Sequence, residues 1–464
     1  MVGGGMAAVR LAELLVGADD LAVTVLADEA YAPYNRILLS AVLEGTHSVG
    51  ALTLRSPEWF AGHGIDLRLA ARVQEIDRAE QEVVLLDGER LGYDRLVLAT
   101  GSIPTLPPIR GLVRRDGTLH PAVHPFRSMA DCLRLDSAVA DLVASPTVTG
   151  GAPRAVVVGG GLLGLQVARA LAVRGLATEV VEGAEHLLAS QVSRPSGRLL
   201  ARDLRRLGTE VYTGARAIRL TDEGLVLDNG AVLPTDLVAL TAGGRPSTSL
   251  ARRAGLSVRR GVVVDDTLSS VDDARVHAIG DCAEHGGRTT GFVPPAWEQA
   301  EVLARALRGG PATYDGTRMV ARLRATGLDV AVLGDPRRAT GEVVEVSNPV
   351  AGSHRRLVLE GDRIVAAELV GDLSRVGLIT QLYDRGSVLG PDEPGQLLLP
   401  EPAATAAPLP DDAEVCACAG VSAGTIRSCG SFAACVDATR ATTGCGGCRD
   451  VVRRLIGERA VVSA

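Results

Sequence analysis

A glycine-rich stretch near residue 160 has the spacing of a turn that joins a buried strand to a helix. Residues 155–158 read Ala-Val-Val-Val, and Gly159, Gly161 and Gly164 follow in the pattern Gly-x-Gly-x-x-Gly. In a parallel sheet the first glycine permits a tight turn, the second lets the backbone approach a pyrophosphate, and the third lets helix and strand pack closely. The positive end of the helix then faces the phosphates. The sequence therefore predicts a dinucleotide-binding unit in an α/β protein.

An acidic residue stands where such a unit binds the ribose of its nucleotide. Glu182 ends the next predicted strand, 23 residues after Gly159. A carboxylate there accepts hydrogen bonds from the ribose diol and repels a 2′-phosphate. No arginine occurs in the ten residues after Glu182. This pattern favours NADH over NADPH.

The same pattern begins at the third residue of the chain. Gly3, Gly5 and Ala8 have the required spacing, and Glu29 follows 26 residues after Gly3, with Asp28 as the alternative acid. One such pattern is weak support, but two in one chain, each followed by an acid, predict two dinucleotide sites. Only two residues precede Gly3, whereas a first strand of this kind needs about five. We expect the natural chain to begin upstream, and a chain that began at residue 1 to bind its nucleotide less well.

Composition limits the remaining function classes. The 464 residues suffice for about three domains. The net charge is −7, lysine is absent, and the arginines form no basic tract, which speaks against nucleic-acid binding. No apolar run approaches the ~18 residues of a membrane span, and no signal peptide is recognisable. We expect a cytoplasmic protein without a membrane anchor.

Further motifs give the chain a family resemblance. Residues 99–101 (Ala-Thr-Gly), Gly280 with Asp281, and the two glycine patterns resemble the pyridine nucleotide-disulfide oxidoreductase superfamily of flavoprotein reductases. Residues 34–40 and 295–300 are similar to the flavin half of the assimilatory NADH nitrite reductase large subunit. They are equally similar to the electron-transfer subunit of assimilatory nitrate reductase. The likeness runs from residue 1 to about residue 458.

The resemblance implies an α/β fold with two Rossmann-like domains, the second inserted into the first. An FAD-binding domain would comprise residues 1–112 and 236–310, and an NAD(P)H-binding domain residues 113–235. A small α+β interface domain (311–398), a Pro/Ala-rich linker (399–412) and a small helical domain (413–464) would follow. The interface domain suggests a homodimer.

The resemblance also implies roles for single residues. Gly3, Gly5, Ala8 and Glu29 would hold the adenosine half of FAD, and Asp281 its ribitol or phosphate, next to Thr100, Gly101 and Gly280. Asn35 and Arg36 would lie near the flavin, where an arginine stabilises the reduced ring. An ordinary surface ion pair is an equal alternative for Arg36. Gly243 would lie beside the nicotinamide, although an ordinary turn explains this glycine nearly as well.

Six of the eight cysteines lie near the C-terminus. Cys416 and Cys418 form one close pair, and Cys445 and Cys448 form another. Four thiolates in two pairs suit either Zn²⁺ or an iron–sulfur cluster. The surrounding residues resemble the bacterioferritin-associated-ferredoxin-like (BFD-like) [2Fe-2S] module, in which both pairs bind the cluster, although the spacing here is about five residues short. We favour the cluster because a flavin upstream would supply it with electrons. We interpret Cys429 and Cys435 as small buried residues, with a replacement ligand as the alternative for one of them.

Three functions remain compatible with these features. The first is an NADH-dependent enzyme that passes electrons through FAD and [2Fe-2S] to a separate nitrate or nitrite reductase. The second is a stand-alone flavin reductase of small or ferredoxin-like acceptors, and the third is a non-enzymatic redox sensor or docking module. Outside the C-terminal region no cysteine pair has the spacing of a redox disulfide, so a disulfide reductase is disfavoured. The chain lacks the four further cysteines of a sirohaem domain, so we expect no nitrite reduction by this chain alone.

Overall fold

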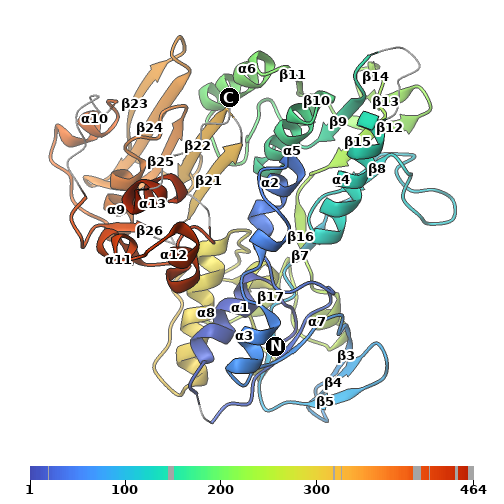
Figure 1. The fold of residues 1–464 in the computed structure, drawn as a ribbon, viewed down its shortest axis with the longest axis vertical. Coiled ribbons are helices and arrows are strands. Elements are labelled where there is room, and N and C mark those ends of the chain that lie inside the picture. Colours follow the sequence, from blue (N-terminus) through green and yellow to red (C-terminus); the bar gives the residue numbers. More distant parts are fainter. Residues whose placement is uncertain are drawn as a thin grey trace. The chain divides into compact units, whose positions relative to one another are not determined.

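The structure is a computed structural model that describes residues 1–18, 20–144, 151–316, 319–325, 327–400, 409–416, 419–444 and 448–457. The chain forms two compact units (Figure 1). The first unit comprises Met1–Ile109, Val113–Asp141 and Ala239–Arg318; the second comprises Arg110–Leu112, Leu142–Val238 and Met319–Ala464. The α/β fold class with two Rossmann-like parallel sheets is confirmed, whereas the finer domain boundaries stay predictions.

A parallel sheet forms the centre of the first unit. Val2 bridges in parallel to Leu26 on one side and to Leu98 on the other, so the predicted strand before Gly3 is represented by this single residue. Leu26 belongs to β1 (Thr24–Leu26), which is paired in parallel with β2 (Asp66–Arg68). Leu98 belongs to β6 (Leu96–Leu98), which is paired in parallel with β19 (Asp273–Ala278).

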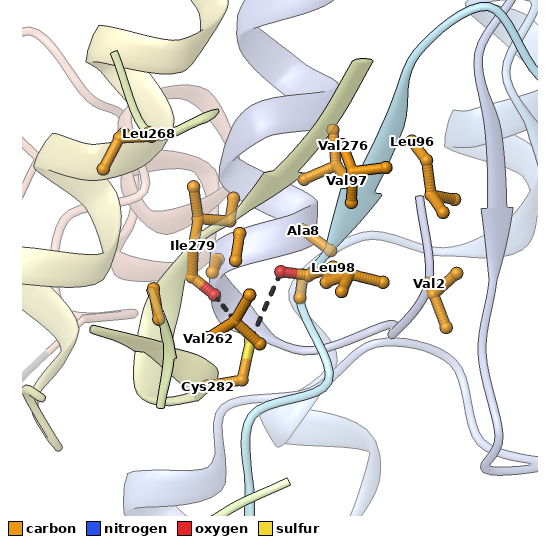
Figure 2. Packing of buried hydrophobic residues seen from close by; sticks show 14 of the residues in the cluster. Val2, Ala8, Leu96, Val97, Leu98, Val262, Leu268, Val276, Ile279 and Cys282 are labelled. Atoms are coloured by element: carbon orange, nitrogen blue, oxygen red, sulfur yellow. Dashed lines mark hydrogen bonds between the residues drawn. The ribbon is translucent and has the colours of Figure 1, made fainter. Parts of the chain in front are cut away.

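Helix α1 (Met6–Leu15) packs on this sheet because its apolar residues recur at helical spacing. Ala8 and Leu11 are fully buried, and both belong to the same core cluster as Val2 and Leu98. Figure 2 shows Val2, Ala8, Leu98 and Cys282 in this cluster. The thiol of Cys282 donates to the Leu98 carbonyl at 3.3 Å, so Cys282 is a buried packing residue of the core.

Short elements complete the first unit. Strands β18, β17 and β20 continue the sheet beyond β19 in the order β20-β17-β18-β19-β6, and β3-β4-β5 and β7-β16 form two separate antiparallel sheets. Their bounds are β3 (Val73–Asp77), β4 (Glu82–Leu85), β5 (Arg90–Gly92), β7 (Ser102–Pro104), β8 (Val123–Pro125), β16 (Gly244–Pro246), β17 (Val262–Val264), β18 (Ser269–Ser270) and β20 (Ala283–His285). The helices are η1 (Arg36–Leu38), α2 (Leu39–Glu44), η2 (Gly50–Leu52), α3 (Pro57–Gly62), α4 (Met129–Ala144, which continues into the second unit), α7 (Ser249–Arg253), η3 (Gly280–Cys282) and α8 (Val293–Leu307).

The second unit contains the other parallel sheet. Strands β9, β10 and β11 are paired in parallel, with β10 in the middle. Helix α5 connects β9 to β10, and α6 connects β10 to β11. The bounds are β9 (Arg154–Val158), α5 (Leu162–Val173), β10 (Ala177–Glu182), α6 (Arg194–Arg206), β11 (Thr209–Thr213), β12 (Ala217–Thr221), β13 (Gly224–Leu227), β14 (Val232–Leu233) and β15 (Leu237–Leu240). This is the strand-helix-strand order that the glycine pattern predicts.

An antiparallel sheet in the order β21-β22-β25-β24-β23 forms a further part of the second unit. Strands β22, β24 and β25 are mostly buried, whereas β23 at the edge is mostly exposed, and buried residues of β24 and β25 pack against α9. The bounds are β21 (Val320–Ala325), β22 (Leu328–Leu333), β23 (Glu342–Asn348), β24 (Ser353–Glu360), β25 (Arg363–Val370), α9 (Val376–Arg385) and α10 (Glu393–Leu397).

A buried carboxylate on this antiparallel sheet holds the start of α6. Glu368 on β25 is fully buried and accepts a hydrogen bond of 2.6 Å from the Ser193 amide and another from the Ser193 hydroxyl. His354 Nε2 on β24 lies 3.2 Å from the same carboxylate. The anion therefore lies at the positive end of α6, where the helix dipole stabilises it.

The C-terminal residues of the second unit form a small, mostly helical module. Its elements are β26 (Glu414–Cys416), β27 (Val421–Ser422), α11 (Ala423–Arg427), α12 (Phe432–Thr439) and α13 (Arg449–Ile456). Ile426 and Val452 are completely buried in its core. Among the described residues no helix is long and apolar enough to cross a membrane.

Candidate functional site: two glycine turns and a cysteine module

The first glycine turn requires a residue without a side chain at position 3. Gly3 has φ +114°, and its amide donates to the Leu26 carbonyl at 2.8 Å. A Cβ atom on Gly3 would lie 2.2 Å from the carbonyl oxygen of Ala99. The turn therefore passes directly against the strand end that leads into Thr100 and Gly101.

The second glycine turn has the same geometry. Gly159 has φ +116°, and its amide donates to the Val181 carbonyl at 2.9 Å. Gly5 and Gly161 cap helices α1 and α5 in nearly the same extended conformation, φ −82° and −79°, without a side-chain cap. A Cβ atom on Gly5 or Gly161 would meet no atom within 4 Å, so the backbone there is open to a ligand. Both helix starts therefore fit a pyrophosphate.

The third positions of the two patterns are buried. Ala8 has no exposed surface, and Gly164 is buried on α5. Small residues there let each helix approach its sheet closely.

Glu182, the acidic residue paired with the second glycine turn, lies beside that turn. One carboxylate oxygen of Glu182 accepts a hydrogen bond of 2.6 Å from the Gly160 amide, and the other accepts one of 2.8 Å from the Ala184 amide. A Cβ atom on Gly160 would lie 3.0 Å from Glu182 Oε2. The carboxylate is therefore fixed next to the phosphate-binding backbone, where it suits a ribose hydroxyl.

Glu29, the acidic residue paired with the first glycine turn, is part of a polar cluster with Tyr34 and Arg36. Glu29 forms an ion pair with Arg36 and accepts a hydrogen bond of 2.7 Å from the Tyr34 hydroxyl. Burial and the neighbouring Glu29 carboxylate raise the pKa of Tyr34, and the Tyr34 oxygen accepts the Met129 amide at 2.8 Å. Arg36 is thus in an ion pair, which is one of the two roles that the sequence suggested for this residue. Its partner is the acid expected at the adenosine end of FAD.

Asn35 has a local structural contact. Its side chain is buried and accepts a hydrogen bond of 3.0 Å from the Ile37 amide, which caps η1. This contact explains why an asparagine precedes the helical turn. Roles of Asn35 and Arg36 at the flavin stay predictions.

The turn at Gly280 and Asp281 lies beside the first turn of α1. Gly280 has φ +74°, and a Cβ atom on it would lie 3.2 Å from the Cβ of Ala7. Its amide donates to Gln299 Oε1 at 2.7 Å. The Asp281 carboxylate accepts hydrogen bonds from Ser102 at 2.7 Å and from Arg127 at 2.6 Å. The predicted FAD residues Gly5, Ala8 and Asp281 are therefore brought together within the first unit.

Three further predicted positions lie between strands of the first unit: Thr100 and Gly101 come just before β7, and Gly243 comes just before β16. The Thr100 hydroxyl donates to the Ser247 carbonyl at 2.8 Å, and Gly101 has φ +65°. Gly243 has φ +90°, and its carbonyl accepts the Thr105 amide at 3.0 Å. Both glycines therefore occupy turns that other residues adopt only with strain.

Arg127 is a candidate site residue that the sequence did not reveal. Its Nε donates to the Ser102 carbonyl at 3.1 Å, and its Nη2 reaches both the Ser102 hydroxyl and Asp281. It lies 154 positions from Asp281 in the chain and belongs to no recognisable motif. Only the pairing of distant strands places this cation beside the predicted phosphate-binding turn.

Two of the four predicted cluster ligands are placed in the C-terminal module. Cys416 and Cys448 are both buried, and they belong to one core cluster with Cys435. Cys435 is completely buried, as predicted, whereas Cys429 is half-buried. Cys418 and Cys445 lie outside the described residues. The described residues include two of the four predicted ligands, and among them no group of three or more His, Cys, Asp or Glu could hold a metal ion.

Two glycine turns of one geometry on two parallel sheets define an oxidoreductase of the two-dinucleotide class. Residues 1–301 match the pyridine nucleotide-disulphide oxidoreductase family, and the chain belongs to this family. The family resemblance inferred from the motifs is confirmed.

Individual proteins of this kind are similar to nearly the whole chain. The chain is 33% identical to the nitrite reductase [NAD(P)H] of Bacillus subtilis, over 98% of this chain and 57% of that protein. It is 29% identical to the assimilatory nitrate reductase electron transfer subunit of the same organism, over 98% of this chain and 59% of that protein. The chain therefore spans less than two thirds of these relatives. Among solved structures, a putidaredoxin reductase in covalent complex with putidaredoxin is similar, with TM-score 0.75, 26% identity, and 86% of this chain and 94% of that chain covered.

Proposed function

We propose that this protein takes electrons from NADH and passes them through FAD and a [2Fe-2S] cluster to a separate nitrate or nitrite reductase. The observation that carries the proposal is the pair of equivalent glycine turns in one chain that also contains a buried cysteine module. The similarity to a nitrite reductase and to a nitrate reductase electron transfer subunit over 98% of the chain supports it. A cytoplasmic location and a homodimer are part of the proposal.

The first unit would hold FAD. Its open helix start at Gly5 would bind the pyrophosphate, and Glu29 would accept hydrogen bonds from the adenosine ribose. Arg127 supplies a fixed positive charge that Asp281 and Ser102 orient. Since Gly280 packs against Ala7, this charged pair is next to the same helix start.

The second unit would hold NADH. The open backbone at Gly161 would receive its pyrophosphate, and Glu182 would bind the ribose diol. The loop after β10 folds back onto the turn, because the Leu188 amide donates to the Gly160 carbonyl at 2.9 Å. This contact fixes the loop against the backbone of the turn.

The C-terminal module would hold the cluster. Hydride transfer moves two electrons and a [2Fe-2S] centre accepts one, so a bound flavin supplies the conversion between the two. Cys416 and Cys448 contribute one thiolate from each arm, and their burial in one apolar core would exclude water from the metal. Cys418 and Cys445 would complete the ligand set.

An anaerobic titration of the purified protein with NADH tests the proposal. We expect bleaching of the flavin absorbance and an electron paramagnetic resonance signal from a reduced cluster. Flavin reduction without a cluster signal would favour the stand-alone reductase, for which the similarity to a putidaredoxin reductase is the supporting observation. Absence of flavin reduction would contradict the proposal.

A further inference from the structure

The loop that follows β11 lies against the end of β10, which carries the ribose-binding acid. Glu182 and Thr213 are partners in the parallel pairing of these strands. Beyond the strands, the Gly214 amide donates to the Ala184 carbonyl at 2.7 Å, and the Ala215 amide donates to the Glu182 carbonyl at 3.2 Å. The next residue of the loop, Arg216, is therefore held beside the adenosine end of the second site.

The backbone of Arg216 is fixed by two hydrogen bonds with one residue. Its amide donates to Asp228 Oδ1 at 3.0 Å, and its carbonyl accepts the Asp228 amide at 2.8 Å. These bonds join the start of β12 to the turn after β13. The position of the Arg216 side chain thus depends on an ordered loop.

The side chain of Arg216 lies over Gly183, the residue that follows Glu182. A Cβ atom on Gly183 would be 3.2 Å from Arg216 Cγ and 3.4 Å from its Nε. A glycine at this position therefore leaves room for the arginine. Arg216 is exposed, and within the described ranges its guanidinium has no carboxylate partner.

An acid and an arginine thus lie close together at the end of β10, since Arg216 covers the residue that follows Glu182. Both oxygens of Glu182 already accept backbone amides, and these dipoles offset part of its negative charge. The guanidinium offers a planar pair of donors that suits a phosphate group. No arginine follows Glu182 within ten residues of the chain, but Arg216, 34 residues further on, reaches the same strand end through the fold.

We propose that Arg216 is a specificity-determining residue that binds the 2′-phosphate of NADPH, so that the second site accepts NADPH as well as NADH. The inference rests on the proposed function, because it assigns the second glycine turn to a pyridine nucleotide. Glu182 ends β10, whereas Arg216 lies in the loop after β11, so residues from two different strand ends would recognise the adenosine ribose.

The test compares two nucleotides that differ only in the 2′-phosphate. Binding of 2′,5′-ADP and of 5′-AMP is measured by calorimetry for the wild type, Arg216→Ala and the control Arg219→Ala. Arg219 is also an exposed arginine, three residues further on, so its removal changes the net charge equally. We expect Arg216→Ala to weaken 2′,5′-ADP binding about ten- to hundredfold and to leave 5′-AMP within about twofold. Arg219→Ala should leave both unchanged.

Two results would overturn the inference. One is an equal change in the binding of both nucleotides on Arg216→Ala, and the other is a wild type that binds 2′,5′-ADP at least tenfold more weakly than 5′-AMP. Retained 5′-AMP binding shows that the variant is folded. If NADH reduces the flavin while either result holds, only the inference fails. If NADH does not reduce the flavin, the proposed function itself fails.

Discussion

The carboxylate of Glu182 accepts a hydrogen bond of 2.6 Å from the amide of Gly160, the middle residue of the second glycine turn. The acid that would recognise the ribose is thus held by the backbone that would bind the phosphates. A nucleotide entering this site meets both groups in one fixed arrangement, because neither needs to move to reach the other.

Replacement of Glu182 by alanine should therefore change nucleotide discrimination. We expect kcat/KM for NADH to fall about ten- to hundredfold, since a hydrogen bond to a charged group contributes about 1.5–3 kcal/mol, while kcat/KM for NADPH falls less. Steady-state assays with ferricyanide as acceptor measure both values. Glu185→Ala is the control, because Glu185 is an exposed acid three residues further on. An unchanged ratio of the two kcat/KM values would remove Glu182 from the ribose site.

Alanine substitutions at Gly3 and Gly5 should have different consequences. Gly3→Ala places a Cβ atom 2.2 Å from a backbone oxygen at φ +114°, so it should lower the thermal unfolding midpoint of the apoprotein. Gly5→Ala meets no protein atom and has φ −82°, so it should leave that midpoint within about 2 °C and weaken FAD binding. Flavin release on gel filtration and differential scanning fluorimetry measure the two effects. Full flavin retention by Gly5→Ala would contradict the assignment of the first site.

The buried Glu368 should make stability depend on pH. Burial raises the pKa of Glu368, but the hydrogen bonds from His354 and Ser193 outweigh it and hold the pKa below its ordinary value of 4.5. The charged carboxylate therefore stabilises the fold fully above about pH 4.5, and this contribution is lost as the pH falls through the lowered pKa. Glu368→Gln should destabilise the second unit by about 1–3 kcal/mol at pH 7.

Urea unfolding of the wild type and Glu368→Gln at pH 7 and at pH 4 measures this dependence. The stability difference between the two proteins should be smaller at the lower pH, since protonation removes the charge that the substitution removes. Glu360→Gln, an exposed glutamate on β24, is the control and should change neither value by more than about 0.5 kcal/mol. A difference independent of pH would show that the charge of Glu368 does not stabilise the fold.

The substitution Cys448→Ser should abolish electron transfer beyond the flavin and leave electron transfer from NADH to the flavin intact. Cys448→Ser removes one predicted ligand, so the cluster signal and reduction of the partner reductase should be lost, while NADH–ferricyanide activity stays within about twofold. Cys429→Ser is the control, because Cys429 is half-buried and belongs to neither close pair. The same two activities should survive in the control. Equal loss of both activities in Cys448→Ser would contradict an order in which the flavin precedes the cluster.

The glycine turns were predictable because their requirements are local. Gly3 and Gly159 must adopt a positive φ between a strand and a helix that are adjacent in the chain, and only glycine does this without strain. Each paired acid follows within 30 residues, since one helix separates the two strand ends. The fold class followed from the same spacing.

Arg127, Arg216 and Glu368 were not predictable in this way. Each lies in a segment without a motif, and each contacts a residue that is 33 to 175 positions away. Their partners are Asp281, Gly183 and Ser193. The pairing of strands and the packing of a helix on a separate sheet bring these residues together, and neither leaves a periodic pattern in the chain.

The amino-acid sequence by itself thus determined the two glycine turns and the family to which the chain belongs, because the geometry of a strand-turn-helix unit is encoded in neighbouring residues. Only the tertiary structure decided which charges surround those turns. Arginine and glutamate side chains fit almost any exposed position, so their partners depend on which distant backbone segments become neighbours when the chain folds.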